Sequence, residues 1–198
     1  MADRRRGTST ATDLALIAVF AALIAAFAAV PAIPVGSVGV PITLQTLGVT
    51  LTGLVLGPWR GFAATLLYLL VGFAGLPVFA GGAAGLSVLQ RPSVGYLLSF
   101  PVAALVAGAL AAYVVRRGLR PLYVWLFVAG MGASLLVVHP AGILGIAVVT
   151  HVDLRTAFLA DLAFWPGDIV KNLAAAGIAL AVHKAFPALL VPRRAVPA

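Results

Sequence analysis

The stretch 164–186, FWPGDIVKNLAAAGIALAVHKAF, places a carboxylate and an ammonium inside an otherwise apolar segment. Pro166 and Gly167 are helix breakers, and Asp168 stands directly after them, where an N-cap residue is expected. Lys171 follows three residues later, so the two side chains share one face of the predicted helix. Each charge costs about 2.5–3.5 kcal/mol in a membrane helix, and such residues normally face the protein interior and mark a site. The stretch therefore predicts a last membrane-spanning helix that carries a functional pair.

A plainer interpretation of Asp168 and Lys171 exists. An Asp at the membrane interface caps a helix, and a Lys can extend along a helix to reach water. Asp168 fits that interpretation well. Lys171 fits it less well, because its stem would have to run back past Asp168 toward the helix start. We therefore favour the functional pair.

Composition indicates that the whole chain is a membrane protein. Of its 198 residues 63% are hydrophobic and 9% charged, and the mean hydropathy is +1.14. Soluble domains are about 45–50% apolar and about 25% charged. Cys is absent, which excludes disulfides and Cys-ligated metals. The expected fold class is all-α, a polytopic membrane protein.

Six apolar segments are expected to span the membrane within one domain, 13–186. They are 14–30, 42–56, 62–76, 93–115, 121–149 and 164–186. A cleaved signal peptide is the alternative for the first, but its removal would spoil the topology. The second and third are short for a bilayer that takes about 20 helical residues, so they either extend into loops or lie partly inside a bundle. Pro140 is expected to kink the fifth span, and 150–165 is expected to be a polar connection.

Basic residues predict the orientation of these spans. Ten of the thirteen Lys and Arg fall on the side of the termini: Arg4, Arg5, Arg6, Arg60, Arg116, Arg117, Arg120, Lys184, Arg193 and Arg194. Because basic residues accumulate in cytoplasmic loops, we expect 1–12 and 187–198 to be cytoplasmic tails. The formal net charge of +8 is thus explained by topology, and no nucleic-acid partner is expected.

The segment 73–92, FAGLPVFAGGAAGLSVLQRP, is too apolar for a solvated loop and too rich in Gly and Pro for a helix. Irregular backbone at membrane depth is tolerated where it is buried in protein or lines a cavity. We interpret it as a lid over an outward-facing pocket, to which the Pro- and Gly-containing loop 31–41 also contributes. The alternative is an interfacial turn without a ligand role.

Motifs for chemistry are missing from the sequence. Neither Lys lies in a Walker A loop, and no Ser lies in a G-x-S-x-G turn. Among the three His only His151 has a carboxylate, Asp153, at metal-ligand spacing, and we interpret that pair as part of a solvated loop surface. We therefore expect a binding protein without catalytic residues, metal or cofactor, which depends on a partner for energy. Small residues spaced by four in the first span predict a helix-docking face, with internal packing as the alternative. These residues are Ala18, Ala22, Ala25 and Ala26.

Four runs of the sequence resemble the BioY family, the biotin-specific substrate-binding (S) components of energy-coupling factor transporters. They are GVPITLQTLGVTLTGLVLGPWRG (39–61), LLYLLVGFAGLPVFAGG (66–82), GYLLSFP (95–101) and PGDIVKN (166–172). The resemblance covers most of 14–186. It implies a six-helix S component in the bacterial plasma membrane, with both termini cytoplasmic, that captures biotin from outside. It also implies as partners a transmembrane T component and two ATPase subunits.

The resemblance further implies that the D-x-x-K pair, Asp168 and Lys171, contacts biotin. The family has an Asn after its G-L-P-V-F segment, but here the only Asn is Asn172, so Ser87, Gln90 or backbone groups would have to substitute. Arg91 is an alternative partner for the ligand carboxylate. The complete set of candidate biotin contacts is Asp168, Lys171, Gln45, Tyr68, Phe79, Ser87, Gln90, Arg91 and Tyr96. Three other hypotheses remain: an S component for another small vitamin, an intramembrane enzyme, and a structural subunit without a ligand.

Overall fold

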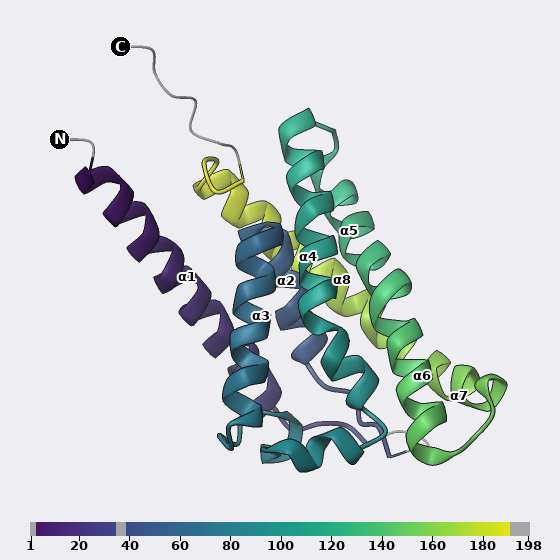
Figure 1. The fold of residues 1–198 in the computed structure, drawn as a ribbon. Coiled ribbons are helices and arrows are strands. Elements are labelled where there is room, and N and C mark those ends of the chain that lie inside the picture. Colours follow the sequence, from purple (N-terminus) through teal and green to yellow (C-terminus); the bar gives the residue numbers. More distant parts are fainter. Residues whose placement is uncertain (1–2, 35–38, 191–198) are drawn as a thin grey trace.

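The computed structural model describes residues 3–34 and 39–190, which form a bundle of helices (Figure 1). Within this part of the chain, β-structure is limited to two isolated bridges, Ile33 with Ile42 and Phe79 with Ala83. The all-α prediction is therefore confirmed. The α-helices are α1 (Asp3–Ala29), α2 (Gln45–Leu56), α3 (Pro58–Phe73), α4 (Val94–Arg117), α5 (Leu122–Ala133), α6 (His139–Thr150), α7 (Leu154–Asp161) and α8 (Trp165–Ala185).

The chain passes along the bundle six times, and α5 and α6 together make one of these passes. Figure 1 places the start of α1, the end of α8 and the turn between α4 and α5 at one end of the bundle. The α1–α2 connection, the α3–α4 connection and α7 lie at the other end. Within the described residues, three segments are long and apolar enough to cross a membrane by length and composition: Thr10–Ala29, Val94–Arg117 and Leu122–Thr150.

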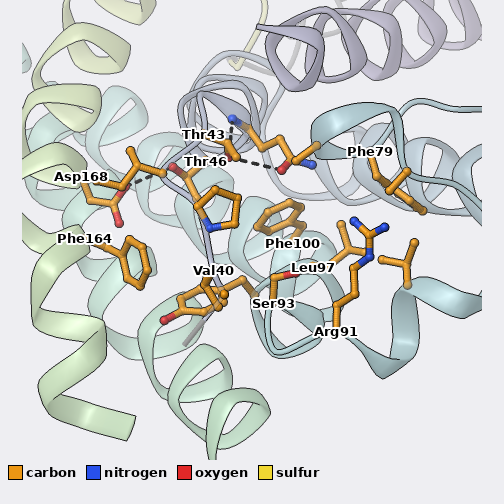
Figure 2. Close-up of a pocket in the computed structure, with 18 of the residues that line it drawn as sticks. Val40, Thr43, Thr46, Phe79, Arg91, Ser93, Leu97, Phe100, Phe164 and Asp168 are labelled. Carbon is orange, nitrogen blue, oxygen red and sulfur yellow. Dashed lines mark hydrogen bonds between the residues drawn. The ribbon is translucent and has the colours of Figure 1, made fainter. Parts of the chain in front are cut away.

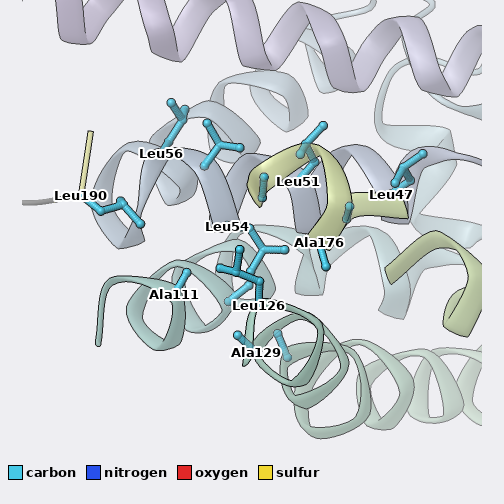
Figure 3. Packing of buried hydrophobic residues seen from close by; sticks show 14 of the residues in the cluster. Leu47, Leu51, Leu54, Leu56, Ala111, Leu126, Ala129, Ala176 and Leu190 are labelled. Atoms are coloured by element: carbon cyan, nitrogen blue, oxygen red, sulfur yellow. The ribbon is translucent and has the colours of Figure 1, made fainter. Parts of the chain in front are cut away.

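Helix α2 lies at the centre of the bundle, which explains why it is short. At about 1.5 Å per residue, its 12 residues reach about 18 Å, well below the roughly 30 Å of a hydrocarbon core. All but two of its residues are buried. Figure 3 shows Leu47, Leu51 and Leu54 of α2 among side chains from α4, α5 and α8. Of the two alternatives for this segment, the structure favours burial inside the bundle.

Close contact between α2 and α4 requires a residue without a side chain. A Cβ atom on Gly53 would lie 2.5 Å from the backbone oxygen of Ala104. Real Cβ atoms do not approach an oxygen so closely, so Gly53 allows the two backbones to meet. At the end of the bundle where α1 begins, an ion pair of 2.8 Å between Arg60 and Asp13 joins α3 to α1.

A π-helical turn, Ser134–Val138, interrupts the fifth pass and ends two residues before Pro140. Proline has no N–H to donate, and its ring collides with the carbonyl of an ordinary preceding helical turn. The wider turn accommodates both effects, and the His139 N–H bonds to the Ser134 carbonyl oxygen. The irregularity expected at Pro140 is thus a π turn, and it begins five residues before His139.

Helical structure extends into two segments that the sequence predicts as a tail and a connection. The basic tail 1–12 is helical from Asp3 onward. The polar connection 150–165 contains α7, whose N-cap is Asp153. The Thr156 backbone N–H and hydroxyl donate to this carboxylate, which lowers the pKa of Asp153.

Candidate functional site

Asp168 and Lys171 form an ion pair in the buried part of α8. The Lys171 Nζ atom lies 2.8 Å from Asp168 Oδ1, and the two residues are 9% and 4% exposed. Thr46 of α2 completes the group, because its hydroxyl accepts from Lys171 Nζ at 3.1 Å and donates to Asp168 Oδ1 at 3.1 Å. The i, i+3 spacing therefore brings the two charges together as predicted, and the partner from α2 is an additional finding.

Asp168 is not the N-cap of its helix, contrary to the sequence prediction. Helix α8 already begins at Trp165, with Pro166 in its first turn. Proline is tolerated there because the first N–H groups of a helix have no partner within the helix. Asp168 therefore lies inside the helix, and its carboxylate is free to point away from the backbone, toward α2 and Lys171. Asn172 supports this turn by donating from Nδ2 to the Asp168 backbone oxygen at 2.8 Å.

This ion pair lines a pocket of about 110 Å³ at the end of the bundle opposite the start of α1 and the end of α8. Figure 2 shows Asp168 and Phe164 on one side of the pocket and Phe79 and Arg91 on the other. The apolar walls come from α4, from the α1–α2 and α3–α4 connections, and from the turn before α8. Their larger members are Val40, Ile42, Phe79, Val88, Leu97, Phe100 and Phe164.

Gln45 presents a polar group to this pocket from the start of α2. Tyr68, which lies behind the lining, hydrogen-bonds to the Gln45 side chain. The Gln45 Nε2 atom donates to the Tyr68 hydroxyl at 2.5 Å, and that hydroxyl donates to the Val78 carbonyl at 3.1 Å. Gln45 lines the pocket, whereas Tyr68 is buried outside the lining. Tyr68 thus joins α2, α3 and the segment that follows α3.

The connection between α3 and α4 covers one side of the pocket, where a lid was predicted. It contains two 3-10 turns, Ala80–Gly82 and Leu86–Gln90. Phe79 packs edge-on against Tyr68, and its ring occupies the space where Gly72 lacks a Cβ atom. Arg91 also lines the pocket. The irregular backbone of this segment is therefore packed on α3 and faces a cavity.

Other residues proposed from this connection lie elsewhere. Ser87 and Gln90 are exposed and do not line the pocket, and the Ser87 hydroxyl bonds to the nearby Ala84 carbonyl at 3.4 Å. Leu76 and Leu86, two apolar residues of the same connection, are more than half exposed. Of the loop 31–41, residues 35–38, including Gly36, lie outside the described residues. Its described part contributes Gly39, Val40 and Pro41 to the lining.

A second buried polar cluster lies beside the first, and the sequence did not predict it. Asp161, the last residue of α7, is 0% exposed. Its carboxylate accepts from the Tyr96 hydroxyl at 2.6 Å and from Trp165 Nε1 at 2.9 Å. His139 Nδ1 lies 2.9 Å from Asp161 Oδ1, and His139 Nε2 lies 3.6 Å from Asp168 Oδ2. His139 is 22 residues from Asp161, so no local spacing could have connected them.

The exposure of α1 separates its alanines into two groups. Ala18, Ala22 and Ala26 are exposed and lie four residues apart, so they form one open face. Ala25 is half-buried and packs against the core cluster that contains Ile24. No group of three or more metal-binding side chains occurs in the described part of the chain.

Comparison with known proteins gives consistent matches over nearly the full chain. The model of the BioY family matches residues 2–188. A biotin transporter BioY of Rhizobium etli is 40% identical over 185 residues, which cover 92% of this chain and 98% of that protein. A biotin transporter BioY of Rhodobacter capsulatus is 42% identical over 195 residues, covering 91% of this chain and 98% of that one.

A solved structure is also similar. It is the S-component for biotin from an ECF-type ABC transporter, and it superimposes with a TM-score of 0.84 at 25% sequence identity. The match covers 89% of this chain and 93% of the other chain. The bundle and its order of helices are therefore those of a known membrane fold.

Proposed function

This chain belongs to the BioY family, and we propose that it is the biotin-binding membrane subunit of an importer driven by an energy-coupling factor module. Members of this family are transporter components, and the chain is not an enzyme. The observation that carries the proposal is the buried Asp168–Lys171 pair at the polar end of a pocket with apolar walls. Ligand pockets typically combine apolar walls with a few placed polar groups.

The polar end of the pocket matches the ureido ring of biotin. That ring offers two N–H donors and one carbonyl acceptor. Asp168 can accept from an N–H, and Lys171 and Thr46 can donate to the carbonyl once they turn from each other to the ligand. Gln45, which lies on the same helix as Thr46, supplies a further amide. Buried groups that already bond one another are held in place for the ligand.

The rest of the pocket suits the remainder of the molecule. The sulfur-containing ring and the aliphatic chain are apolar, and Phe79, Phe100 and Phe164 offer apolar surfaces for them. Arg91 lies across the pocket from Asp168 and can neutralise the carboxylate at the end of the chain (Figure 2). Biotin would thus lie with its ureido ring at α8 and its carboxylate at the lid.

The proposal includes partners and an orientation in the plasma membrane. A transmembrane T component and two ATPase subunits would supply the energy, and the T component would dock on Ala18, Ala22 and Ala26 of α1. The bundle end with the chain termini would face the cytoplasm, and the pocket end would face outward. The domain 13–186 would form the membrane part, while 1–12 and 187–198 would flank it on the cytoplasmic side.

The test is ligand binding by the isolated subunit. The purified chain in lipid nanodiscs is titrated with labelled biotin, and binding is then challenged with an excess of other water-soluble vitamins. We expect saturable binding of one biotin per chain that the other vitamins do not displace. Displacement by another vitamin would indicate an S component for that vitamin, and absence of any ligand would indicate a structural subunit.

A further inference from the structure

His139 lies between two buried carboxylates that belong to different helices. Its Nδ1 atom is 2.9 Å from Asp161 Oδ1 in α7, and its Nε2 atom is 3.6 Å from Asp168 Oδ2 in α8. Nε2 is buried and has no hydrogen-bond partner in the described part of the chain. The Lys171 and Thr46 bonds both use the other oxygen of Asp168, Oδ1. The unpartnered nitrogen therefore faces the oxygen that these two donors leave free.

The charged groups in contact with His139 carry more negative than positive charge. Asp161 and Asp168 supply two negative charges, and Lys171 supplies one positive charge. Tyr96 of α4 donates to Asp161, and Arg155 of α7 is exposed to solvent. A buried net charge is unfavourable, so a further positive charge among these groups stabilises the cluster.

We infer that His139 is a positioning residue for the binding site: Asp161 holds its ring through Nδ1, and a proton on Nε2 is donated to Asp168 Oδ2. The inference rests on the proposed function, because Asp168 is the residue assigned to the ligand. A hydrogen bond needs the two atoms to approach from 3.6 Å to about 3.2 Å or less, a shift of about 0.4 Å. Polar contacts in an empty site are often longer than in the liganded one.

The hydrogen bond from His139 Nε2 to Asp168 Oδ2 determines the orientation in which the Asp168 carboxylate contacts the ligand. With Oδ2 held by His139, the carboxylate presents Oδ1 in a fixed orientation to the pocket. With the proton removed, two carboxylates face one ammonium, and Asp168 Oδ2 loses the donor that fixes its orientation. Affinity should therefore fall as the pH rises, by at most about tenfold per pH unit, which is the limit for a single proton.

The first experiment determines which ring nitrogens of His139 carry a proton, in the absence of ligand. Histidine labelled with 15N is incorporated into the full chain in nanodiscs, and the three His signals are assigned with His139→Gln and His183→Gln. We expect protons on both ring nitrogens of His139 at neutral pH in the wild type. A bare Nε2 in the wild type would overturn the inference.

The second experiment measures biotin affinity between pH 6 and 9. The chain has three His and no Cys, so few other groups titrate in this range. We expect affinity to fall with pH in the wild type. In His139→Gln it should be about tenfold or more lower and independent of pH, which is a typical loss when an orienting partner is removed. His183→Gln is the matched control, because His183 is also buried and also has an unpartnered ring nitrogen, but it bonds to the Leu54 carbonyl.

The outcomes separate the two proposals. If His139→Gln keeps the wild-type pH profile, His139 does not position Asp168. If His139→Gln does not fold, Asp161→Asn takes its place, because Asn keeps the shape at that position and should also flatten the profile. If the wild type binds no biotin at any pH, the proposed function fails, and the histidine signals still decide whether Nε2 carries the proton.

Discussion

Single residues at the polar end of the pocket should control affinity. Asp168→Asn and Lys171→Ala each leave one partner of a buried ion pair without its counter-charge. Truncation of such a pair costs about 2–5 kcal/mol, so we expect biotin affinity to fall roughly 30-fold or more. Biotin titration of the folded variants measures this. Wild-type affinity in both variants would contradict the assignment of the site.

Thr46 offers a second test at the same scale, one that changes no charge. Its hydroxyl bonds to both charged groups, so Thr46→Val should weaken biotin binding roughly tenfold, within the range for hydrogen bonds to charged groups. Thr52→Val is the control, because Thr52 is buried in the same helix but bonds to the Gly48 carbonyl of its own helix. Equal affinities in the two variants would exclude a role for Thr46 in the site.

At the scale of the elements, the position of the α3–α4 connection depends on one contact with α3. A Cβ atom on Gly72 would overlap the ring of Phe79, so Gly72→Ala should push that ring, and the wall it forms, out of place. We expect weaker biotin binding, with the helices intact by circular dichroism. Gly132→Ala is the control: its new Cβ would meet Leu110 at an ordinary 3.7 Å, so affinity should not change.

The same connection should become more protected when ligand binds. Its backbone forms few regular hydrogen bonds, although it lines the pocket together with 39–43. Ligand contacts in these segments should reduce their opening. Hydrogen exchange measured with and without biotin should show that biotin slows exchange in 74–93 and 39–43. Biotin should leave exchange in α5, which lies outside the lining, unchanged. A response confined to the helices would place the ligand elsewhere.

At the scale of the whole molecule, α1 presents a face that the rest of the bundle leaves open. Ala22 is exposed at the middle of this face, so Ala22→Trp should block close approach of a T component while the pocket remains intact. We expect loss of co-purification and of energised uptake, with unchanged biotin binding by the isolated subunit. Leu136→Trp is the control, because Leu136 is 74% exposed on the fifth pass.

Two outcomes would contradict this use of α1. Normal assembly of Ala22→Trp would place the docking face on another helix. Loss of biotin binding in the same variant would show that the face serves internal packing. Ala25→Trp is a less useful variant, because Ala25 is half-buried against the core and a large ring there should also destabilise the fold.

The sequence by itself determined the class of fold and the position of the charged pair. Apolar runs long enough for a bilayer predict helices, because a chain in lipid must satisfy its backbone hydrogen bonds internally. The i, i+3 spacing of Asp168 and Lys171 predicts a shared helix face, and the structure joins them at 2.8 Å. Such features depend on neighbours in the chain, and so a sequence displays them directly.

Only the tertiary structure decided which distant residues complete the site. Thr46 reaches Lys171 from 125 residues away, and His139 reaches Asp161 across a turn and a helix. Ser87 and Gln90 were predicted to contact the ligand because they are polar residues of the lid segment. In the structure both lie in a 3-10 turn and are exposed to solvent. The direction of a side chain in irregular backbone, and the partner that it meets, depend on how the helices pack. No local spacing encodes that packing.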